Sequence, residues 1–554
     1  MPAKILQLDP HDNVVMALTT LDLGAEIQLG TNSSAAPCIL KQSVPAKHKL
    51  ALADLKPGDL IRMYGMVVGE AVEAIPRGGL LTTENVQHRA GAYTAARRPV
   101  SYAVPDPAPW AGRTFMGFHR ADGQVGTRNY WIVLPLVFCE NRNIEQMKEA
   151  LEEELGYGRA NPAYRRRVRR LIEEQRGGAG KNPDSAALAA EAERQRGERV
   201  FANVDGVRFI THQLGCGGTR QDARALCGLL AGYIHNPNVA GATVLSLGCQ
   251  NAQAAILMDE LRDRDPELRK PLVLVDQQQS GLETTLMEQA IDRTFAALAE
   301  ANRAERATAP LSALTLAMQC GGSDGFSGVS ANPTIGYVSD LVAGLGGKTI
   351  LSEFPELHGV EQELINRCAT DELAERFSQL MRDYAARARA AQSGFKFNPS
   401  PGNIREGLIT DAIKSAGAAR KGGVSLVRGV LDYPEYVSTP GLNLQCTPGN
   451  DIESVTAQVG AGASLVLFTT GLGTPTGNPI APVIKVTTNS TTAQRMSDIV
   501  DFDAGGIVTG GTTVRECGEQ LMEIAIDVAS GKRLTKSEMR GQMDFIPWKR
   551  GVSL

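Results

Sequence analysis

The chain has few of the features that mark secreted, membrane or disulfide-stapled proteins. Its nine cysteines among 554 residues are neither dense nor paired in spacing, which favours free thiols in a reducing compartment over a disulfide framework. The longest apolar run, from Trp131 to Phe138, is far below the roughly 20 residues of a membrane helix. The first twenty residues contain acids and no unbroken apolar stretch. We therefore expect a cytoplasmic protein with no membrane partner.

The charge also lacks a dominant sign. Fifty-seven Lys and Arg against 61 Asp and Glu give a formal net charge of −4, so no whole-chain positive field attracts nucleic acid. The basic run at 165–170 (RRRVRR) is offset by nearby glutamates and lacks aromatic residues for base stacking, which predicts a solvated face. We expect a small molecule as the partner, no nucleic acid, and a homo-oligomer, a dimer, as the assembly.

The length exceeds what one hydrophobic core serves, so several domains are expected. Residues 1–95 hold short alternating runs separated by turn signals, typical of a small β-rich domain. Four prolines at 96–111 predict an extended linker. Apolar runs and amphipathic stretches then alternate over 112–305 and 306–554, which predicts two α/β domains with mostly parallel sheets. Because 24 of the 60 residues at 141–200 are charged, we interpret that segment as a solvated helical insertion.

Four apolar runs lead directly into polar, glycine-containing loops, which carry Cys216, Cys249, Cys320 and the segment Thr469–Gly473. Strands of a parallel sheet end at one edge, so such loops can share a cleft. Helix N-termini behind them would favour an anion such as a carboxylate. A cysteine between glycines can also be a small packing residue. Because the sequence has no CxxC pair, it indicates metal binding by thiolates only weakly. Both interpretations stay open.

Other motifs give single candidates. The run at 471–477 (GLGTPTG) meets two prolines instead of opening a helix, which argues against a dinucleotide loop. His11, with acidic neighbours, is a candidate metal ligand or proton-transfer group, although a histidine in a small β-domain is more often a surface residue. Arg128 and Arg220 lie in polar loops, and the guanidinium fork suits a carboxylate.

Longer motifs indicate a family. The segments at 117–143 (GFHRADGQVGTRNYWIVLPLVFCENRN), 320–340 (CGGSDGFSGVSANPTIGYVSD) and 468–485 (FTTGLGTPTGNPIAPVIK) resemble the altronate and galactarate dehydratase family. The resemblance covers nearly the whole chain, and HDNV and AKHKLAL resemble its N-terminal SAF-type β-domain. The motifs ENRN, TRQDARALCGLLAGYI and CTPGND resemble the altronate branch of the family.

The resemblance implies a metal-dependent hydro-lyase, with Fe(II) or Mn(II), that converts D-altronate to 2-dehydro-3-deoxy-D-gluconate. Galactarate or another sugar acid is the alternative substrate, and a nucleotide-dependent oxidoreductase or a non-catalytic sugar-acid binding protein is a distant one. Our hypothesis assigns metal binding to His11, His48 and Cys249, and catalysis to His11, His48, Cys216, Cys320 and Asp324. Substrate binding is assigned to Arg128, Arg220, Ser323, Asn332, Thr469, Thr470 and Gly471.

Overall fold

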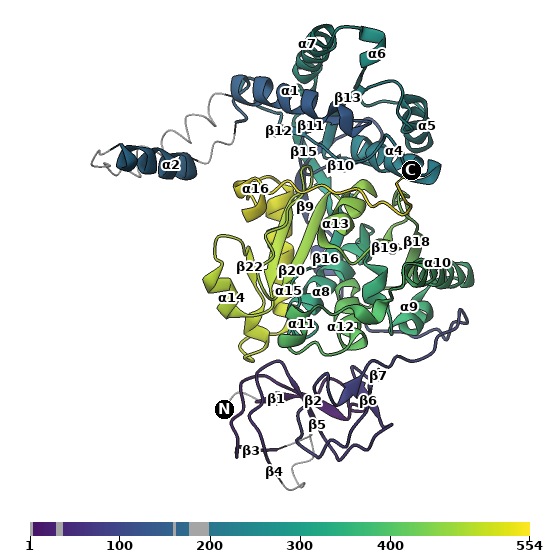
Figure 1. The fold of residues 1–554 in the computed structure, drawn as a ribbon, viewed down its shortest axis with the longest axis vertical. Coiled ribbons are helices and arrows are strands. Elements are labelled where there is room, and N and C mark those ends of the chain that lie inside the picture. Colours follow the sequence, from purple (N-terminus) through teal and green to yellow (C-terminus); the bar gives the residue numbers. More distant parts are fainter. Residues whose placement is uncertain (1–3, 29–36, 159–161, 177–198, 554) are drawn as a thin grey trace. The chain divides into compact units, whose positions relative to one another are not determined.

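The chain divides into two compact units in a computed structural model, which describes residues 4–28, 37–158, 162–176 and 199–553. Unit 1 combines residues 1–117 with 307–549, and unit 2 combines residues 118–306 with 550–554 (Figure 1). None of the described helices combines the length and apolar character that a bilayer crossing requires.

The N-terminal part of unit 1 is a set of short antiparallel strands, as the sequence predicts. Their sheets have the orders β1-β2-β5, β3-β4 and β6-β7-β8. A small core of aliphatic side chains, including Val15, Leu40 and Leu50, lies between them. The strand bounds are β1 Ile5–Leu6, β2 Val14–Ala17, β3 Glu26–Ile27, β4 Cys38–Ile39, β5 Lys49–Ala51, β6 Leu60–Met63, β7 Met66–Ala71 and β8 Val86–Gln87.

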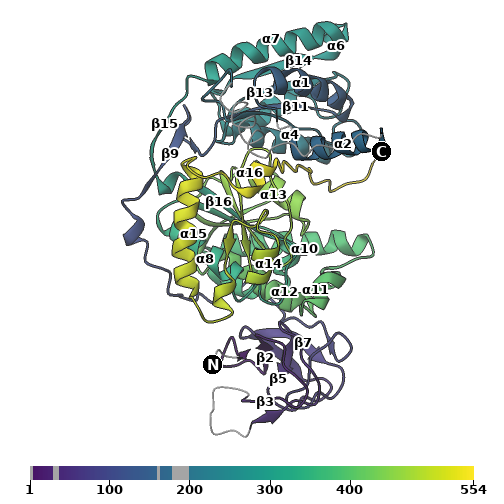
Figure 2. The same cartoon turned by 90° about the vertical axis from the view of Figure 1, so that its left-hand side faces the viewer.

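The rest of unit 1 is a parallel sheet of seven strands in the order β18-β19-β17-β16-β20-β21-β22. Its central strands are buried along their whole length, and helices lie on both faces of the sheet (Figure 2), which is why these strands read as continuous apolar runs. The strand bounds are β16 Thr315–Cys320, β17 Lys348–Leu351, β18 Val427–Leu431, β19 Gly441–Gln445, β20 Leu465–Thr470, β21 Val483–Thr487 and β22 Phe502–Asp503.

Most described helices of unit 1, from α10 to α16, begin at a residue whose side chain caps them. Thr410 and Thr513, for example, accept hydrogen bonds from the first turns of α12 and α15. The bounds are α8 Ala331–Gly344, α9 Glu361–Arg367, α10 Asp371–Ala390, α11 Pro401–Arg405, α12 Asp411–Ala418, α13 Asp451–Gly460, α14 Ser490–Arg495, α15 Val514–Ala529 and α16 Lys536–Arg540.

Unit 2 is built on a second parallel sheet, of four strands in the order β12-β11-β13-β14. The strand bounds are β11 Tyr130–Pro135, β12 Gly206–Phe209, β13 Val239–Ser246 and β14 Leu272–Asp276. The helices are α1 Asn141–Glu154, α2 Pro162–Gln175, α4 Arg220–His235, α5 Ala254–Arg264, α6 Gln277–Ser280 and α7 Glu283–Ala301. A further sheet joins β9 Thr114–His119, β10 Val125–Gly126 and β15 Arg306–Pro310.

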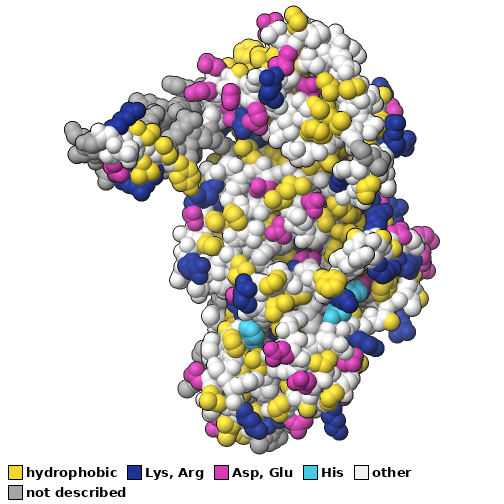
Figure 3. Space-filling view, viewed as in Figure 1, with side chains coloured by type: hydrophobic (Ala, Val, Ile, Leu, Met, Phe, Trp, Pro, Cys, Tyr) yellow, Lys and Arg dark blue, Asp and Glu magenta, His cyan; other side chains and the backbone are white. Residues whose placement is uncertain are grey.

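The segment expected to be a solvated insertion differs from the prediction in its first half. Helix α1 buries Ile144, Met147 and Leu151 in the core of unit 2. These apolar residues recur at helical spacing among many charged residues. The high fraction of charged residues therefore did not indicate that this helix packs in the core. Helix α2 instead exposes Tyr164, Val168, Leu171 and Ile172, and Figure 3 shows apolar side chains on the surface of this helix. Residues 177–198 lie outside the described residues.

Local breaks divide two helical regions of unit 1. Helix α9 ends before Cys368, whose backbone pairs with that of Val427 in an isolated parallel β-bridge, and Thr370 then caps α10. Helix α11 ends just before Gly407, whose φ is 87°, and Thr410 then caps α12.

Candidate active site

The carboxyl edge of the seven-stranded sheet collects polar side chains from several strands. The central strand β16 ends at Cys320, between β17, which leads to Glu353, and β20, which ends at Thr470. In an open parallel sheet this edge is where ligands bind, because polar loops from neighbouring strands meet there. The candidate site is therefore built from the residues at and beyond this edge.

A buried group of acids, lysines and one thiol occupies the end of β16. We call Cys320, Glu353, Glu356, Lys414 and Lys421 the lysine–glutamate cluster. Lys421 Nζ lies 2.8 Å from Cys320 Sγ and 2.5 Å from Glu353 Oε2. Lys414 Nζ lies 2.7 Å from Glu356 Oε1, and the Cys320 thiol donates to Glu356 Oε2 at 3.4 Å. Two ammonium groups thus balance two carboxylates away from water.

Burial and neighbouring charges set the protonation states in this cluster. Burial, with the like charge of Glu356, raises the pKa of Glu353 to about 7, although Lys421 opposes the shift. Burial also acts on Glu356, but Lys414 and Lys421 hold the pKa of that carboxyl below its ordinary value. Burial raises the pKa of Cys320. At neutral pH Cys320 is therefore a thiol, Glu356 is ionised, and Glu353 is poised to hold or release a proton.

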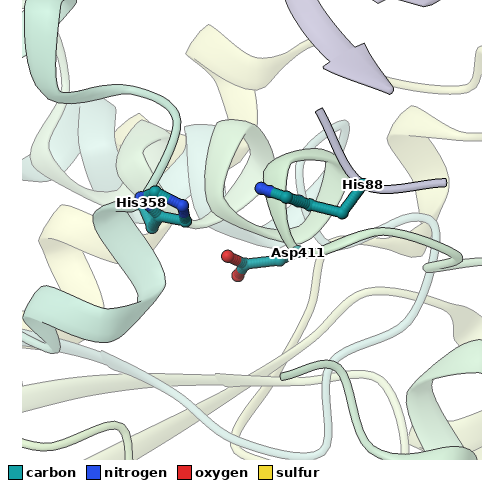
Figure 4. Close-up of side chains that lie close together, drawn as sticks. All are labelled: His88, His358 and Asp411. Carbon is teal, nitrogen blue, oxygen red and sulfur yellow. The ribbon is translucent and has the colours of Figure 1, made fainter. Parts of the chain in front are cut away.

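A second group joins the two parts of unit 1. His88, which follows β8, and His358 and Asp411 offer ligand atoms that all lie within 4.8 Å of one another. Figure 4 shows the two rings and the carboxylate facing a common point. We call these three residues the histidine–aspartate cluster. The rings of His88 and His358 stack with centroids 5.3 Å apart.

The histidine–aspartate cluster has unmet hydrogen-bonding capacity. His88 Nδ1 and Asp411 Oδ2 are buried without a hydrogen-bond partner among the residues that the structure describes, which is costly for a folded protein. Burial lowers the pKa of His88 to about 4, helped by the charge of His358, and burial raises the pKa of Asp411 well above its ordinary value. A bound cation would satisfy both orphaned atoms and reverse the penalty on the carboxylate.

The two clusters differ in how well they suit a divalent metal. Two imidazoles and one carboxylate form the donor set that Fe(II) and related ions take with open positions for a substrate. His358 Nδ1 also hydrogen-bonds Glu361 Oε1 at 2.9 Å, the outer contact that orients many metal-bound histidines. In the lysine–glutamate cluster, by contrast, the ammonium of Lys421 already lies where a cation would sit. The residues of the histidine–aspartate cluster fit the ion.

The clusters adjoin each other. Asp411 and Lys414 lie one turn apart on α12, and Lys414 pairs with Glu356, two residues before His358. Lys414 Nζ also donates to Asn398 Oδ1 at 2.8 Å. One continuous band of ionisable side chains therefore runs from the end of β16 to the N-terminal β-rich part.

A third contact holds the N-terminal part against this edge. Lys47 Nζ lies 3.0 Å from Asp324 Oδ2 and also pairs with Glu406. Asp324 accepts a hydrogen bond from Thr488 Oγ1 at 2.9 Å, and its carboxylate packs against Gly471. Lys49 Nζ donates to Gly407 O at 2.6 Å. The segment 47–49 is therefore anchored to two loops of the C-terminal part, one with Asp324 and one with Glu406 and Gly407.

Comparison with known proteins covers all three segments of the chain. Residues 3–89 match the altronate/galactarate dehydratase SAF domain, residues 117–302 the second domain of D-galactarate dehydratase/altronate hydrolase, and residues 311–553 the C-terminal domain of D-galactarate/altronate dehydratase. The altronate dehydratase of Escherichia coli (strain K12) is 31% identical over 551 residues, 100% of both chains. The chain belongs to the altronate and galactarate dehydratase family. It is accordingly a hydro-lyase with an N-terminal SAF domain, and the resemblance, the fold class and the enzyme class predicted from the sequence are confirmed.

Other members of the family are equally similar. The altronate dehydratase of Bacillus subtilis (strain 168) is 30% identical over 558 residues, 100% of both chains. The galactarate dehydratase (L-threo-forming) of Escherichia coli (strain K12) is 32% identical over 507 residues, which is 91% of this chain and 89% of that one. Sequence identity therefore does not separate the two branches of the family.

The structure of this dehydratase places most of the predicted substrate-binding residues at the site edge, but as buried parts of its framework. Asn332 Oδ1 accepts from Thr469 Oγ1 at 2.6 Å, and Thr470 Oγ1 accepts from Gly473 N at 2.9 Å. Ser323 O accepts from Asn403 Nδ2 at 2.8 Å. These hydrogen bonds shape the loops, and whether the same side chains contact a substrate stays a prediction.

The predicted SAF-domain histidines lie in different surroundings. His48 is half-buried in the anchored segment, and burial lowers its pKa. His11 lies on a turn with 85% of its side chain exposed, and its Nδ1 is 2.9 Å from Asp9 Oδ1. Neither belongs to the histidine–aspartate cluster, so their roles as ligands stay predictions.

The remaining predicted residues belong to unit 2. Arg128 is buried just before β11, at the amino edge of its sheet, where Nη1 donates to Thr127 O at 2.7 Å. Cys216, Cys249 and Arg220 lie at the opposite, carboxyl edge and are exposed. The expected edge therefore carries these three residues but not Arg128.

Sequence reasoning missed the residues that make up the histidine–aspartate cluster. His88 and His358 were visible only as isolated histidines, and Asp411 as the first residue of a helix. They come from three separate segments, so no local spacing could join them. The signal available was indirect: a buried aspartate next to its helix cap, with a lysine one turn later.

Proposed function

We propose that this chain dehydrates D-altronate to 2-dehydro-3-deoxy-D-gluconate with a divalent metal, Fe(II) or Mn(II). The observation that carries the proposal is the histidine–aspartate cluster, whose orphaned atoms and donor set suit such an ion. The full-length similarity to two proteins named altronate dehydratase supports the substrate. Galactarate is the second candidate, because a protein named galactarate dehydratase is as similar over most of its length.

The reaction removes a proton from C2 of the acid and hydroxide from C3. The C3–O bond breaks as the C2–H bonding pair forms the double bond, and the resulting enol becomes the 2-keto product. His88, His358 and Asp411 would hold the ion, which when bound supplies positive charge for the developing enediolate and the leaving oxygen. The protein must therefore supply a proton acceptor, a proton donor and a carboxylate-binding cation.

The lysine–glutamate cluster offers these proton-handling groups. Glu353, with a pKa near 7, can hold or release a proton. Its Oε2 lies 2.5 Å from Lys421 Nζ, whose pKa the charges of Cys320 and Glu353 raise despite burial, so Lys421 stays charged beside it. Lys414 is the cation next to the histidine–aspartate cluster, and its burial favours a charged partner over water. We assign Lys414 to the substrate carboxylate and the Glu353–Lys421 pair to proton storage beneath the site.

The charge balance of the site favours an acid with one carboxylate. Lys414, assigned to one substrate carboxylate, also faces Glu356, while Lys421 and Lys47 are each paired with a carboxylate of the protein. A second terminal carboxylate, as in galactarate, would require a further cation to offset its desolvation. This balance supports an aldonic over an aldaric acid.

An anaerobic substrate panel tests the proposal. Protein stripped with a chelator is supplied with Fe(II), Mn(II) or no metal and offered D-altronate, galactarate and their epimers, and the 2-keto-3-deoxy product is measured. We expect metal-dependent product from altronate at a higher kcat/KM than from any aldaric acid. Faster turnover of galactarate would show that galactarate is the substrate. Turnover that is unchanged without metal would show that the ion takes no part in the mechanism.

A further inference from the structure

The exposed cysteines of the chain gather in one place. All nine cysteines are free, six of them are buried, and Cys139, Cys216 and Cys249 are exposed. Free cysteine is among the most buried residue types, and an exposed one is usually kept for its reactivity or its ligand. All three exposed thiols belong to unit 2, where they follow three different strands of the same sheet.

The topology brings these three thiols to one edge. Strands β12, β11 and β13 are neighbours and run parallel, so their carboxyl ends lie side by side. Cys139 follows β11 in a short 3-10 turn, Cys216 lies in the loop after β12, and Cys249 follows β13. The three thiols are therefore contributed by adjacent strand ends, with no CxxC spacing in the sequence to reveal them.

Hydrogen bonds between the loops fix this arrangement. Phe138 N donates to Leu214 O at 3.0 Å, and Ala252 N donates to Gly215 O at 3.1 Å. Gly215 has a φ of 101°, and a Cβ there would lie 2.1 Å from Leu136 O. Only glycine permits so close a crossing of the end of β11. The crossing brings Gly215, the residue before Cys216, against Leu136 and Val137 in the segment that leads from β11 to Cys139.

The charge environment of this edge suits anionic ligands. Helices α1, α4 and α5 each begin within a few residues after one of these cysteines. Their N-termini favour anionic groups at this edge. Three thiolates would repel one another here unless a cationic centre lay between them.

The spacing distinguishes a single ion from a larger centre. The three sulfur atoms are not among the described groups whose ligand atoms all lie within 4.8 Å of one another. A single tetrahedral ion holds thiolates about 3.8 Å apart, given metal–sulfur bonds of about 2.3 Å. A polynuclear centre, in which each thiolate binds a different iron, holds them further apart. Because the three sulfur atoms do not all lie within 4.8 Å of one another, the arrangement suits a polynuclear centre better than one ion.

We propose that Cys139, Cys216 and Cys249 are the protein ligands of an iron–sulfur cluster in unit 2. With only three thiolates, one iron of a four-iron cluster has no protein ligand. This fourth iron is open to an oxygen of a small hydroxy acid. This site is separate from the histidine–aspartate cluster of unit 1. The cluster proposal is tested by the iron and sulfide content of the protein, whereas the proposed function is tested by turnover of the sugar acid.

The test compares four cysteine variants of the full chain with the wild type. Cys139→Ser, Cys216→Ser and Cys249→Ser each remove one proposed ligand, and Cys227→Ala changes a buried thiol of the same unit as the matched control. Each protein is treated anaerobically with ferric iron, sulfide and excess dithiothreitol. Iron, acid-labile sulfide and the visible absorbance band of the cluster are then measured, with thermal melting as the check on folding.

We expect about four sulfide and four cluster iron per chain in the wild type and the control, and a loss of most of both in each serine variant that still melts cooperatively. The histidine–aspartate cluster can add iron without sulfide, so the sulfide content decides the outcome. As a second measurement on the wild type, loading should protect residues 139, 216 and 249 from alkylation, as mapped by mass spectrometry. Absence of acid-labile sulfide from the loaded wild type, cluster retained in all three serine variants, or unprotected thiols in loaded protein would each overturn the proposal.

Discussion

His88 stacks on His358 with ring centroids 5.3 Å apart and ring planes 25° apart. One histidine comes from the SAF domain and the other from the loop after β17, so the candidate metal ligands meet only when the two parts of unit 1 are docked. The pairs that Lys47 makes with Asp324 and Glu406 supply such a docking contact at the same sheet edge.

Replacing His88 separates metal binding from folding. His88→Ala removes one proposed ligand but breaks no hydrogen bond of Nδ1, so we expect at least about a 100-fold loss of Mn(II) affinity at a stability cost of about 1 kcal/mol or less. Isothermal titration and denaturant unfolding measure the two effects. The exposed His119→Ala is the matched control, and equal Mn(II) affinity in both variants would exclude His88 as a ligand.

The ion pair under the site should behave as a unit. Lys421→Met leaves the buried carboxylate of Glu353 without its cation, and we expect a loss of about 3–5 kcal/mol in the free energy of unfolding. Adding Glu353→Gln removes the unpaired charge, so the double variant should be more stable than Lys421→Met alone. Denaturant titration measures both, and strictly additive losses would show that the two side chains do not interact.

Gly471 is fixed by its contact with Asp324. A Cβ at position 471 would lie 2.4 Å from Asp324 Cγ, and the carboxylate cannot move without losing Lys47 and Thr488. We expect Gly471→Ala to lower the free energy of unfolding by about 1–3 kcal/mol. Gly112→Ala, with open space around the new methyl group, should stay within about 0.5 kcal/mol of the wild type. Similar melting of the two variants would contradict the proposed close packing.

Buried His212 should make unit 2 sensitive to acid. Burial lowers the pKa of His212 from 6.5 to about 4, although Pro135 O accepts from its Nε2 at 2.8 Å. Between these pH values the unfolded chain binds a proton that the folded chain does not, so stability falls as the pH drops from 6.5 to 4, by about 3 kcal/mol in total. His212→Gln should flatten this part of the stability profile. A variant with the wild-type slope would show that other groups cause the acid sensitivity.

Much of the fold followed from the sequence because buried parallel strands have a distinct pattern. The runs at 465–470 and 483–487 are apolar and β-branched, and they are β20 and β21. The charge count at 141–200 misled because a core helix needs only one apolar stripe, which α1 supplies with Ile144, Met147 and Leu151.

The site was less predictable than the fold. Cys320 and Asp324 were expected at the sheet edge because they follow a strand, and the structure places both there. Glu353 and Lys421 have no motif, since they meet only through the strand order β17-β16 and the turn after α12. Assigning His88 to the site requires knowing how the SAF domain packs against the rest of unit 1. The periodicity and spacing of residues in the sequence do not give this information.

The central claim is that a metal held by the histidine–aspartate cluster supports dehydration of a sugar acid. Its most direct test is the rate of 2-keto-3-deoxy product formation from D-altronate, with metal-stripped wild type and Asp411→Asn titrated anaerobically with Mn(II). The account predicts that wild-type activity rises to a plateau with added Mn(II), while the variant remains folded and inactive at the same concentrations. Activity of Asp411→Asn equal to that of the wild type, with the same dependence on Mn(II), would contradict it.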